Sequence, residues 1–206
     1  MLKKALLGSA MLLAATLGHA QDANAPIPPA SSLSPFVGLG LTFGGDQIGK
    51  DIQYSNGNSS KLHAGGLVDL RVGAEYRVSG SPLSFQLSAG YHVDTSLAAD
   101  NGSASFKRFP IELLAHWAIN DSWRIGGGVR KALSAEAKSS GLGTGYVANE
   151  KFNSSTGVVL EVETFALSPK VGIKIRGVSE KYKSQDVPGR ELDGSHIGVI
   201  GVYYFR

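Results

Sequence analysis

The sequence predicts an all-β fold, an eight-stranded antiparallel up-and-down transmembrane β-barrel with a polar, charge-paired lumen. Three observations lead to this prediction. Apolar and polar residues alternate with a period of two from residue 35 to the end of the 206-residue chain. The links between the alternating segments are short and long in turn. The apolar stripes run for about ten residues, the length that a tilted strand needs to cross a bilayer.

The first twenty residues have the three parts of a secretory signal peptide. Lys3 and Lys4 supply positive charge, "ALLGSAMLLAATLG" is an apolar segment, and "GHA" ends at Ala20 with small residues at the cleavage positions. The apolar run is too short to span a membrane comfortably as a helix. We therefore expect a signal peptide at 1–20, a Pro/Ala-rich linker at 21–34 and a barrel at 35–206.

The composition excludes several kinds of protein. The chain has no cysteine, so it has no disulfide framework, no thiolate zinc site, no cysteine nucleophile and no lipid anchor on cysteine. Without the two lysines of the signal peptide, 18 basic residues face 17 acidic residues. A chain this close to neutrality has no global signature of nucleic-acid binding, so we expect no nucleic-acid partner.

Eight segments carry the alternation. We expect strands at 36–44, 66–78, 82–94, 106–119, 122–133, 157–166, 170–182 and 195–205. The links "SGSP", "NDS" and "LSPK" are short and hold residues typical of tight turns, whereas the other four links are long and polar. Every second turn of a meander lies at the same end, so we expect short turns at one end and long loops at the other, as in outer-membrane barrels.

The two faces of each expected strand differ in chemistry. In the second strand, Val68, Leu70, Val72, Ala74, Tyr76 and Val78 alternate with Leu67, Asp69, Arg71, Gly73, Glu75 and Arg77. Soluble sandwiches and lipocalin-like barrels also alternate, with their apolar face turned inward. Aromatic residues near the strand ends favour the membrane instead, because they form girdles at the two interfaces. We expect this aromatic girdle to comprise Tyr76, Tyr91, Trp117, Trp123, Tyr203 and Phe205.

The polar face carries basic and acidic residues in equal number. We expect a lumen charge network of Asp69, Arg71, Glu75, Arg77, Asp94, Arg108, Glu112, Arg124, Arg130, Glu161, Glu163, Lys174, Arg176 and Glu180. An eight-stranded barrel has room inside only for side chains, and each buried charge needs a partner. Glycines on the same face would leave room for the arginines. The network is either a structural plug, which we prefer, or the lining of a narrow pore biased toward anions.

The signal peptide, the linker, the three tight turns and the aromatic C-terminal strand "HIGVIGVYYFR" together resemble the small eight-stranded bacterial outer-membrane β-barrel family, the OmpA-type and OmpW-type barrels. The resemblance covers about residues 33–206 and is specific for architecture, not for activity. It implies a monomer in the bacterial outer membrane, in contact with outer-membrane lipids and lipopolysaccharide. It also implies that the barrel-assembly machinery reads the last strand as an insertion signal through Phe205, although Arg206 follows this residue.

We expect no catalytic, cofactor or metal site. A deacylase site on such a barrel needs a serine soon after a histidine, and none of His63, His92, His116 and His196 has a serine two residues later. No histidine pair has metal-ligand spacing supported by a third group. The histidines at 92, 116 and 196 fall on the inward register instead, where they can join the polar network. The glycine-rich segments lack the spacing of a nucleotide-binding loop.

The sequence thus predicts a non-enzymatic integral outer-membrane barrel with a structural or envelope-interaction role and with its long loops outside. Two alternatives stay open. One is a narrow porin-like channel for small solutes, and the other is a soluble periplasmic or secreted ligand-binding barrel.

Overall fold

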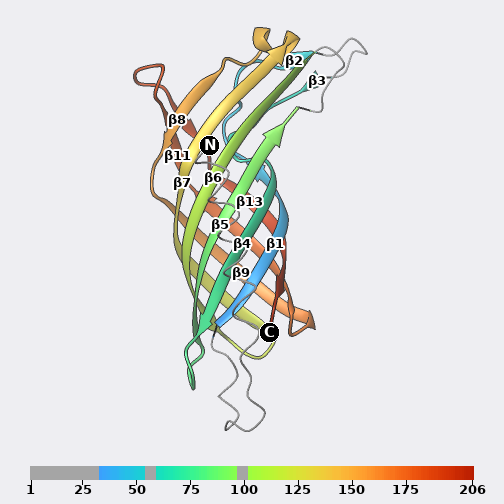
Figure 1. The fold of residues 1–206 in the computed structure, drawn as a ribbon, viewed down its shortest axis with the longest axis vertical. Helices are drawn as coiled ribbons and strands as arrows, with labels where there is room; N and C mark the ends of the chain where they lie inside the picture. The colour runs from blue at the N-terminus through green and yellow to red at the C-terminus, as the bar shows by residue number, and fades with distance from the viewer. Residues whose placement is uncertain (1–32, 54–58, 97–101) are drawn as a thin grey trace, which may run out of the picture.

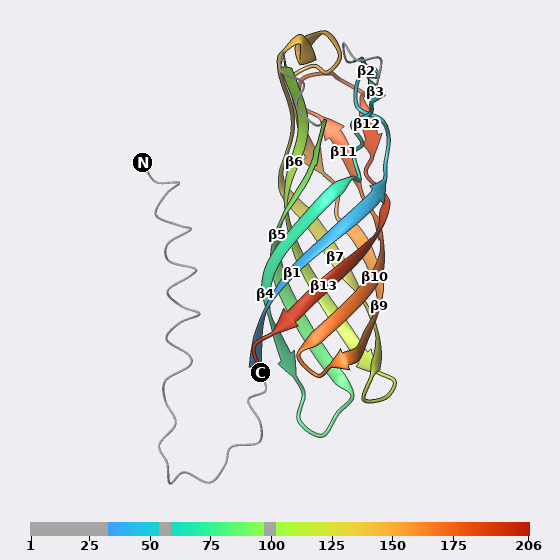
Figure 2. The same ribbon diagram turned by 90° about the vertical axis from the view of Figure 1, so that its right-hand side faces the viewer.

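Eight long strands form a closed antiparallel barrel in the part of the chain that the structure describes (Figures 1 and 2). The structure is a computed structural model, and it describes residues 33–53, 59–96 and 102–206. The eight strands are β1 (Leu33–Gly44), β4 (Leu67–Arg77), β5 (Leu83–Thr95), β6 (Gly102–Ala118), β7 (Trp123–Gly141), β9 (Gly157–Ser168), β10 (Val171–Ser179) and β13 (His196–Tyr204). No helix within these ranges is long and apolar enough to cross a bilayer.

The barrel closes between its first and last strands. Each strand of the eight pairs with the next one along the chain, and β13 pairs with both β10 and β1. The closing register runs from Phe36 opposite Tyr204 to Gly44 opposite His196. The predicted fold class is therefore confirmed. β1 begins at Leu33, three residues before the expected strand start at 36, and the expected signal peptide lies outside the described residues.

The short turns and the long loops lie at opposite ends of the barrel, as expected. The β4–β5, β6–β7 and β9–β10 turns lie at the same end as the C-terminus (Figure 2). The other end carries short additional elements that the sequence pattern did not indicate. They are β2 (Ile52–Gln53), β3 (Ser59–Ser60), β8 (Glu150–Ser154), β11 (Lys181–Ser184), β12 (Glu191–Asp193) and the 3₁₀ turn η2 (Leu142–Gly145).

These additional strands lengthen one side of the barrel beyond the expected boundaries. β6 begins at Gly102 where we expected 106, and β7 continues to Gly141 where we expected 133. β8 pairs with the far part of β7, and β11 pairs with β8 and β12. The expected strand at 170–182 is divided, because β10 loses its partner where β9 begins and the chain then pairs with β8. We call this extension, with the loops that fill it, the crown.

The chemistry of the two faces of the wall reverses between the barrel and the crown. On the lower part of β6, Phe109, Leu113 and Trp117 are exposed on the outer wall. On its upper part, Ala104 and Phe106 point inward and are fully buried. Their apolar cluster also contains Ile48, Ile52, Leu62, Ala64, Ala132, Ala135, Ala137, Val147, Phe152, Tyr182 and Leu192. The crown thus has the polarity of a soluble domain, whereas the barrel below it is inside-out.

A β-bulge lies where the polarity reverses. The register between β6 and β7 shifts between Arg108 and Pro110, which face Ala135 and Ala132 on β7. Proline has no N–H group to donate to the ladder, so this is a natural position for an irregularity. The bulge leaves two successive exposed residues, Leu133 and Ser134, and a strict period of two does not continue through it.

Glycines on the inner face make room for large lumen side chains. A Cβ atom at Gly38 would meet the stem of Arg71 at 2.9 Å, and one at Gly126 or Gly172 would overlap His116 or Glu163. The sequence led us to expect space for arginines, and the structure shows that glycines also accommodate a histidine and a glutamate.

Gly128 allows a close approach of two backbones, which gives a testable prediction. A Cβ atom there would collide with the Leu113 carbonyl oxygen and lie 2.8 Å from the Leu114 Cα, whereas one at Gly177 would meet nothing within 4 Å. We expect Gly128→Ala to lower the free energy of unfolding by ~1–3 kcal/mol. The matched variant Gly177→Ala should change it by less than ~0.5 kcal/mol. Urea unfolding in lipid vesicles measures both, and equal effects would contradict the backbone contact.

Candidate functional site

The interior of the barrel holds the charged residues that the sequence placed there. Of the expected network, every residue except Arg77 is buried. The side chain of Arg77 is 45% exposed, because it lies at the short-turn mouth of the barrel. The buried charges form three groups along the barrel, which we call the upper, middle and lower clusters.

Glu112 is the centre of the upper cluster, which consists of Asp69, Arg71, Glu112, Arg130, Arg176 and Glu180. Its Oε2 accepts hydrogen bonds from Arg71 and, at 2.8 Å, from Arg176 Nη2. Its Oε1 accepts from Arg130 Nη1 at 2.8 Å. Glu112 is 1% exposed, so three guanidinium groups meet one carboxylate out of contact with water.

Two further carboxylates balance the upper cluster. Asp69 accepts a hydrogen bond from Arg71 Nη2 at 2.6 Å, and Glu180 accepts one from Arg130 Nε at 3.2 Å. Three arginines thus share three acids. Buried charges are tolerated when they are paired and hydrogen-bonded. Each of these six groups has a partner of opposite charge, but one oxygen of Asp69 and of Glu180, and nitrogens of Arg71 and Arg176, form no hydrogen bond with the described residues.

His92 joins the upper cluster to the β1 strand. Arg130 Nη2 lies 3.0 Å from His92 Nδ1, and Thr42 Oγ1 lies 2.7 Å from Nε2. A guanidinium can only donate, so Nδ1 accepts and the ring proton is on Nε2, where it is donated to Thr42. Thr42 Oγ1 in turn donates a hydrogen bond to the Gly65 carbonyl oxygen at 2.9 Å. Successive hydrogen bonds therefore run from Arg130 through His92 and Thr42 to the backbone.

Glu161 is the centre of the middle cluster, which also contains His116 and Lys174. Its Oε1 accepts a hydrogen bond from Lys174 Nζ and lies 2.7 Å from His116 Nε2. Lys174 also donates to Gln86 Oε1 at 2.8 Å. The His116, Glu161 and Glu163 ligand atoms lie within 4.8 Å of one another, a grouping that the sequence spacing did not reveal. Lys174 and the guanidinium of Arg124 already occupy these carboxylates, so we assign no metal to them.

Arg124 is the centre of the lower cluster. It donates to Glu75 Oε2 at 2.5 Å, to Glu163 Oε2 at 2.8 Å and to the Tyr204 hydroxyl at 2.7 Å. Tyr204 in turn donates to Glu163 Oε1 at 2.8 Å. Tyr204 is fully buried on the inner face, although the expected network did not include it. The sequence offered one signal for this position: Tyr204 lies two residues after Val202 and four after Ile200, so the three side chains share one face of β13.

Arg206, which follows Phe205, points into the barrel mouth, a position that the sequence did not predict. Its side chain turns back into the mouth, where Nη2 lies 3.1 Å from Glu75 Oε1 and Nη1 donates to the Pro169 carbonyl at 2.8 Å. Its guanidinium lies over the rings of Tyr204 and Phe165, at 4.6 Å and 5.1 Å from their centroids. Cation–π contact and a carboxylate oxygen that Arg206 shares with Arg77 explain this position.

Two members of the expected network bind a loop and not their fellow lumen charges. Arg108 donates to the carbonyl oxygens of Ala64 and Gly66, and its guanidinium lies 5.0 Å from the Phe106 ring centroid. Asp94 accepts a hydrogen bond from the His63 backbone at 2.7 Å. Both residues lie above the upper cluster, and there they fix the loop that closes the barrel beneath the apolar core of the crown.

The expected girdle residues lie on the outer wall. Tyr76, Trp117, Trp123, Tyr203 and Phe205 are exposed around the short-turn end, and the Tyr203 and Phe205 rings pack at 5.0 Å. Tyr91 lies toward the other end, where its ring packs on Phe109 at 5.1 Å. The aromatic side chains therefore lie near both ends of the apolar wall.

The closed pairing and the inside-out polarity define the class of protein, a small transmembrane β-barrel with a charge-paired lumen. No protein-family model matches the chain, and no curated protein matches it. Among solved structures, the chain is similar to Neisserial surface protein A, with 15% identity, TM-score 0.48 and coverage of 85% of this chain and 98% of that one.

Two other solved structures show a similar degree of likeness. The attachment invasion locus protein Ail of Yersinia pestis has 13% identity and TM-score 0.48, with coverage of 84% and 96%. The outer membrane protein AlkL in lipid bilayers has 11% identity and TM-score 0.42, with coverage of 91% and 97%. The class assignment rests on the strand pairing and the polarity of the wall.

Glu112 gives the sharpest test of the network. Removing its charge with Glu112→Gln leaves Arg71, Arg130 and Arg176 short of one buried negative charge. We expect a loss of ~3–5 kcal/mol in the free energy of unfolding. The control Glu136→Gln removes the acid of an exposed pair with Lys138 at 2.8 Å and should cost at most ~1 kcal/mol. Urea unfolding in lipid vesicles compares the two, and similar losses would show that the buried network contributes no more than a surface pair.

Proposed function

We propose that the protein is an integral barrel of the bacterial outer membrane with a structural or envelope-interaction role, exported by a signal peptide at 1–20. The apolar outer wall is the observation that carries the proposal. The outer stripe of β6 runs from Phe109 to Ile119 with Ile111, Leu113 and Trp117 between them, and all are exposed. At ~3.3 Å per residue and a strand tilt of ~40°, this stripe is ~25 Å tall, the height of the apolar band of outer-membrane barrels.

The crown supports the envelope-interaction role. Phe106 packs against Phe152 and Tyr182, with ring centroids 5.6 Å and 5.3 Å apart, so the crown has its own aromatic core. Paired strands over such a core hold a fixed surface beyond the apolar band, and a fixed surface loses less conformational entropy on contact than free loops would. The outer face of the crown is charged, with exposed Lys138 and Lys151.

A groove at the upper edge of the apolar band supports contact with lipopolysaccharide. It has a volume of about 1120 Å³ and lies between β7 and β8. Apolar Phe109 and Leu133 line it together with Lys131, Lys138 and Lys151. Lysines beside apolar side chains at this height suit the phosphate groups and acyl chains of an anionic lipid. We also infer a monomer, with Phe205 as the terminal aromatic residue that the barrel-assembly machinery would recognise.

The interior favours a plug over a channel. The upper, middle and lower clusters fill the lumen with mutually bonded side chains, and the apolar core of the crown lies above them. A conducting path would require the ion pairs to separate and the core to open. The exposed apolar wall speaks against a soluble barrel, since a patch of this size is not found on soluble monomers.

The histidines support a non-enzymatic role. Within the described residues, their ring nitrogens contact Thr42, Arg130, Glu161 or backbone carbonyl oxygens, and none is bonded to a serine hydroxyl. This supports the proposal, because a hydrolase that uses a serine nucleophile needs a histidine bonded to that serine.

The location gives a direct prediction. Expressed with its signal sequence in a Gram-negative host, the protein should be recovered in the outer-membrane fraction. On a detergent gel, the unboiled protein should migrate faster than the boiled protein, because the closed barrel stays compact until it is heated. Recovery in the soluble fraction without detergent, or identical migration of the two samples, would refute the proposal in favour of the soluble barrel.

The plug gives a second prediction. Folded wild-type protein, verified by its heat-dependent gel shift, should show no stepwise conductance in a planar lipid bilayer. The channel alternative predicts stepwise conductance that Arg71→Gln or Arg176→Gln alters, since both guanidinium groups lie in the lumen. A reproducible conductance sensitive to either substitution would replace the plug with the pore.

A further inference from the structure

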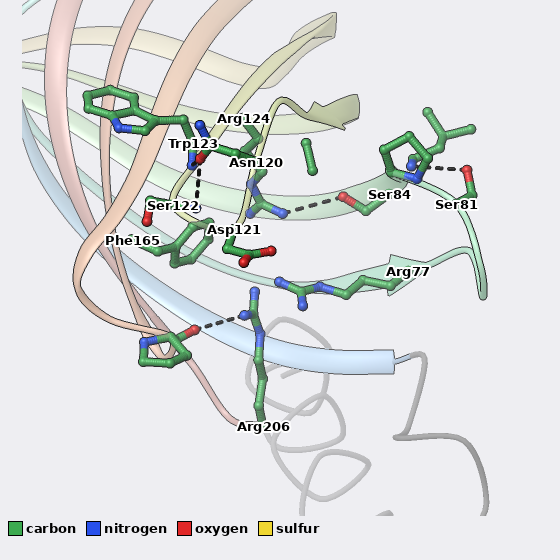
Figure 3. A pocket seen from close by; sticks show the side chains of 14 residues that line it. Arg77, Ser81, Ser84, Asn120, Asp121, Ser122, Trp123, Arg124, Phe165 and Arg206 are labelled. Atoms are coloured by element: carbon green, nitrogen blue, oxygen red, sulfur yellow. Dashed lines mark hydrogen bonds between the residues drawn. The ribbon is translucent and has the colours of Figure 1, made fainter.

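A pocket opens at the short-turn mouth of the barrel, below the lower cluster, and shares Arg124 with it. Its volume is about 500 Å³, and its walls come from the β4–β5, β6–β7 and β9–β10 turns and the C-terminal residue. Figure 3 shows the guanidinium groups of Arg77, Arg124 and Arg206 pointing toward this space from three different segments. Apolar side chains, among them Leu83 and Phe165, form the rest of the lining.

Two of these guanidinium groups share a single acceptor atom. Arg77 Nε donates to Glu75 Oε1 at 2.6 Å, and Arg206 Nη2 lies 3.1 Å from the same oxygen. In the described part of the chain, no group accepts a hydrogen bond from the two terminal nitrogens of Arg77. The fork that suits a bidentate oxyanion is therefore held in place with its donors unused.

The mouth has more positive than negative charge among its bonded groups. Glu75 and Glu163 are the carboxylates that bond the arginines here, and both are already shared with Arg124. Three guanidinium groups thus share two bonded carboxylates, and a third acid, Asp121, lines the pocket. Burial, and then the charges of Arg77 and Arg124, lower the pKa of Arg206 from its ordinary value, while Glu75 opposes the shift.

Asp121 is the acid that an incoming anion would meet. It lies on the β6–β7 turn, is exposed and lines the pocket. Figure 3 shows its carboxylate facing the same space as Arg77. It makes no ion pair within 4.0 Å with the described residues, so it lowers the positive potential of the mouth without occupying the arginine donors.

We propose that this pocket binds a small organic oxyanion, a phosphate monoester or a carboxylate attached to an apolar group. Arg77 and Arg206 would bind the oxyanion with their outward donors, and the Phe165 ring and Leu83 would contact the apolar part. Phe165 is rigidly placed for this, because the guanidinium groups of Arg124 and Arg206 lie 4.9 Å and 5.1 Å from its ring centroid. That the ligand arrives from the periplasm rests on the proposed function, but the binding itself does not.

Calorimetric titration of the full barrel, folded in detergent, tests the proposal with phenyl phosphate, benzoate and phenol as probes. We expect binding of at least one anion and none of phenol, and a comparison of the two anions identifies the oxyanion chemistry. Arg77→Gln and Arg206→Gln should each weaken the binding about tenfold, the usual loss for one charge-assisted contact. Lys170→Gln removes the same charge from the same end but outside the pocket, and it should bind as the wild type does.

A variant that leaves the arginines intact keeps the test decisive. Asp121→Asn removes the repelling carboxylate and touches none of the lower-cluster bonds, so it should strengthen anion binding several-fold. The proposal fails if folded protein binds neither anion, if phenol binds as well, or if Asp121→Asn, Arg77→Gln and Lys170→Gln all behave alike. The heat-dependent gel shift, run on the same samples, separates this failure from failure of the membrane-barrel assignment.

Discussion

A barrel of eight strands has room inside only for side chains, so each charge that faces inward must find its counter-charge inside. The rest of the structure follows from this constraint. Glu112 takes three arginines because no water is available to solvate them, and Arg124 is divided between two glutamates and a tyrosine for the same reason. The glycines opposite Arg71, His116 and Glu163 give these side chains the volume that they need.

The same constraint explains why the wall can be apolar. A bilayer offers no hydrogen-bond partner to the backbone, and the closed ladder from β1 to β13 satisfies those groups without one. With polar side chains confined to the lumen, the outer face is left to leucine, valine, isoleucine and aromatic residues. Lumen and wall are thus two results of one alternation, and neither could be changed alone without exposing a charge to lipid or an apolar side chain to the network.

The structure could be predicted from the sequence in the part of the chain where this alternation is uniform. The eight strands, the closure, the ends of the barrel and the inward set of charges all follow from period two and turn residues. The crown did not follow, because a period of two does not say which face is inside, and the faces exchange their chemistry near Arg108. The pairing within the network could not be predicted from the sequence either. Lys174, for example, could pair with any acidic residue at the same level of the barrel. The position of Arg206 could not be predicted either, because its acceptor, Glu75, lies far away in the chain and is brought near only by closure.

The β-bulge in β7 opposite Pro110 lies at the boundary between the barrel and the crown. Below it, the inward residues of β7 are arginines, glycines and Ala132, and above it they are Ala135 and Ala137, which face a hydrophobic core. The extra residue shifts the parity of β7 alone, because the inward residues of β6 stay even-numbered from Ala104 to His116 while their chemistry changes. The bulge thus takes up the extra residue of β7 at one point, and the pairing of Pro110–Ala118 with Arg124–Ala132 below it keeps a single register. The inner wall of the barrel is therefore geometrically independent of the number of residues that β7 contributes to the crown.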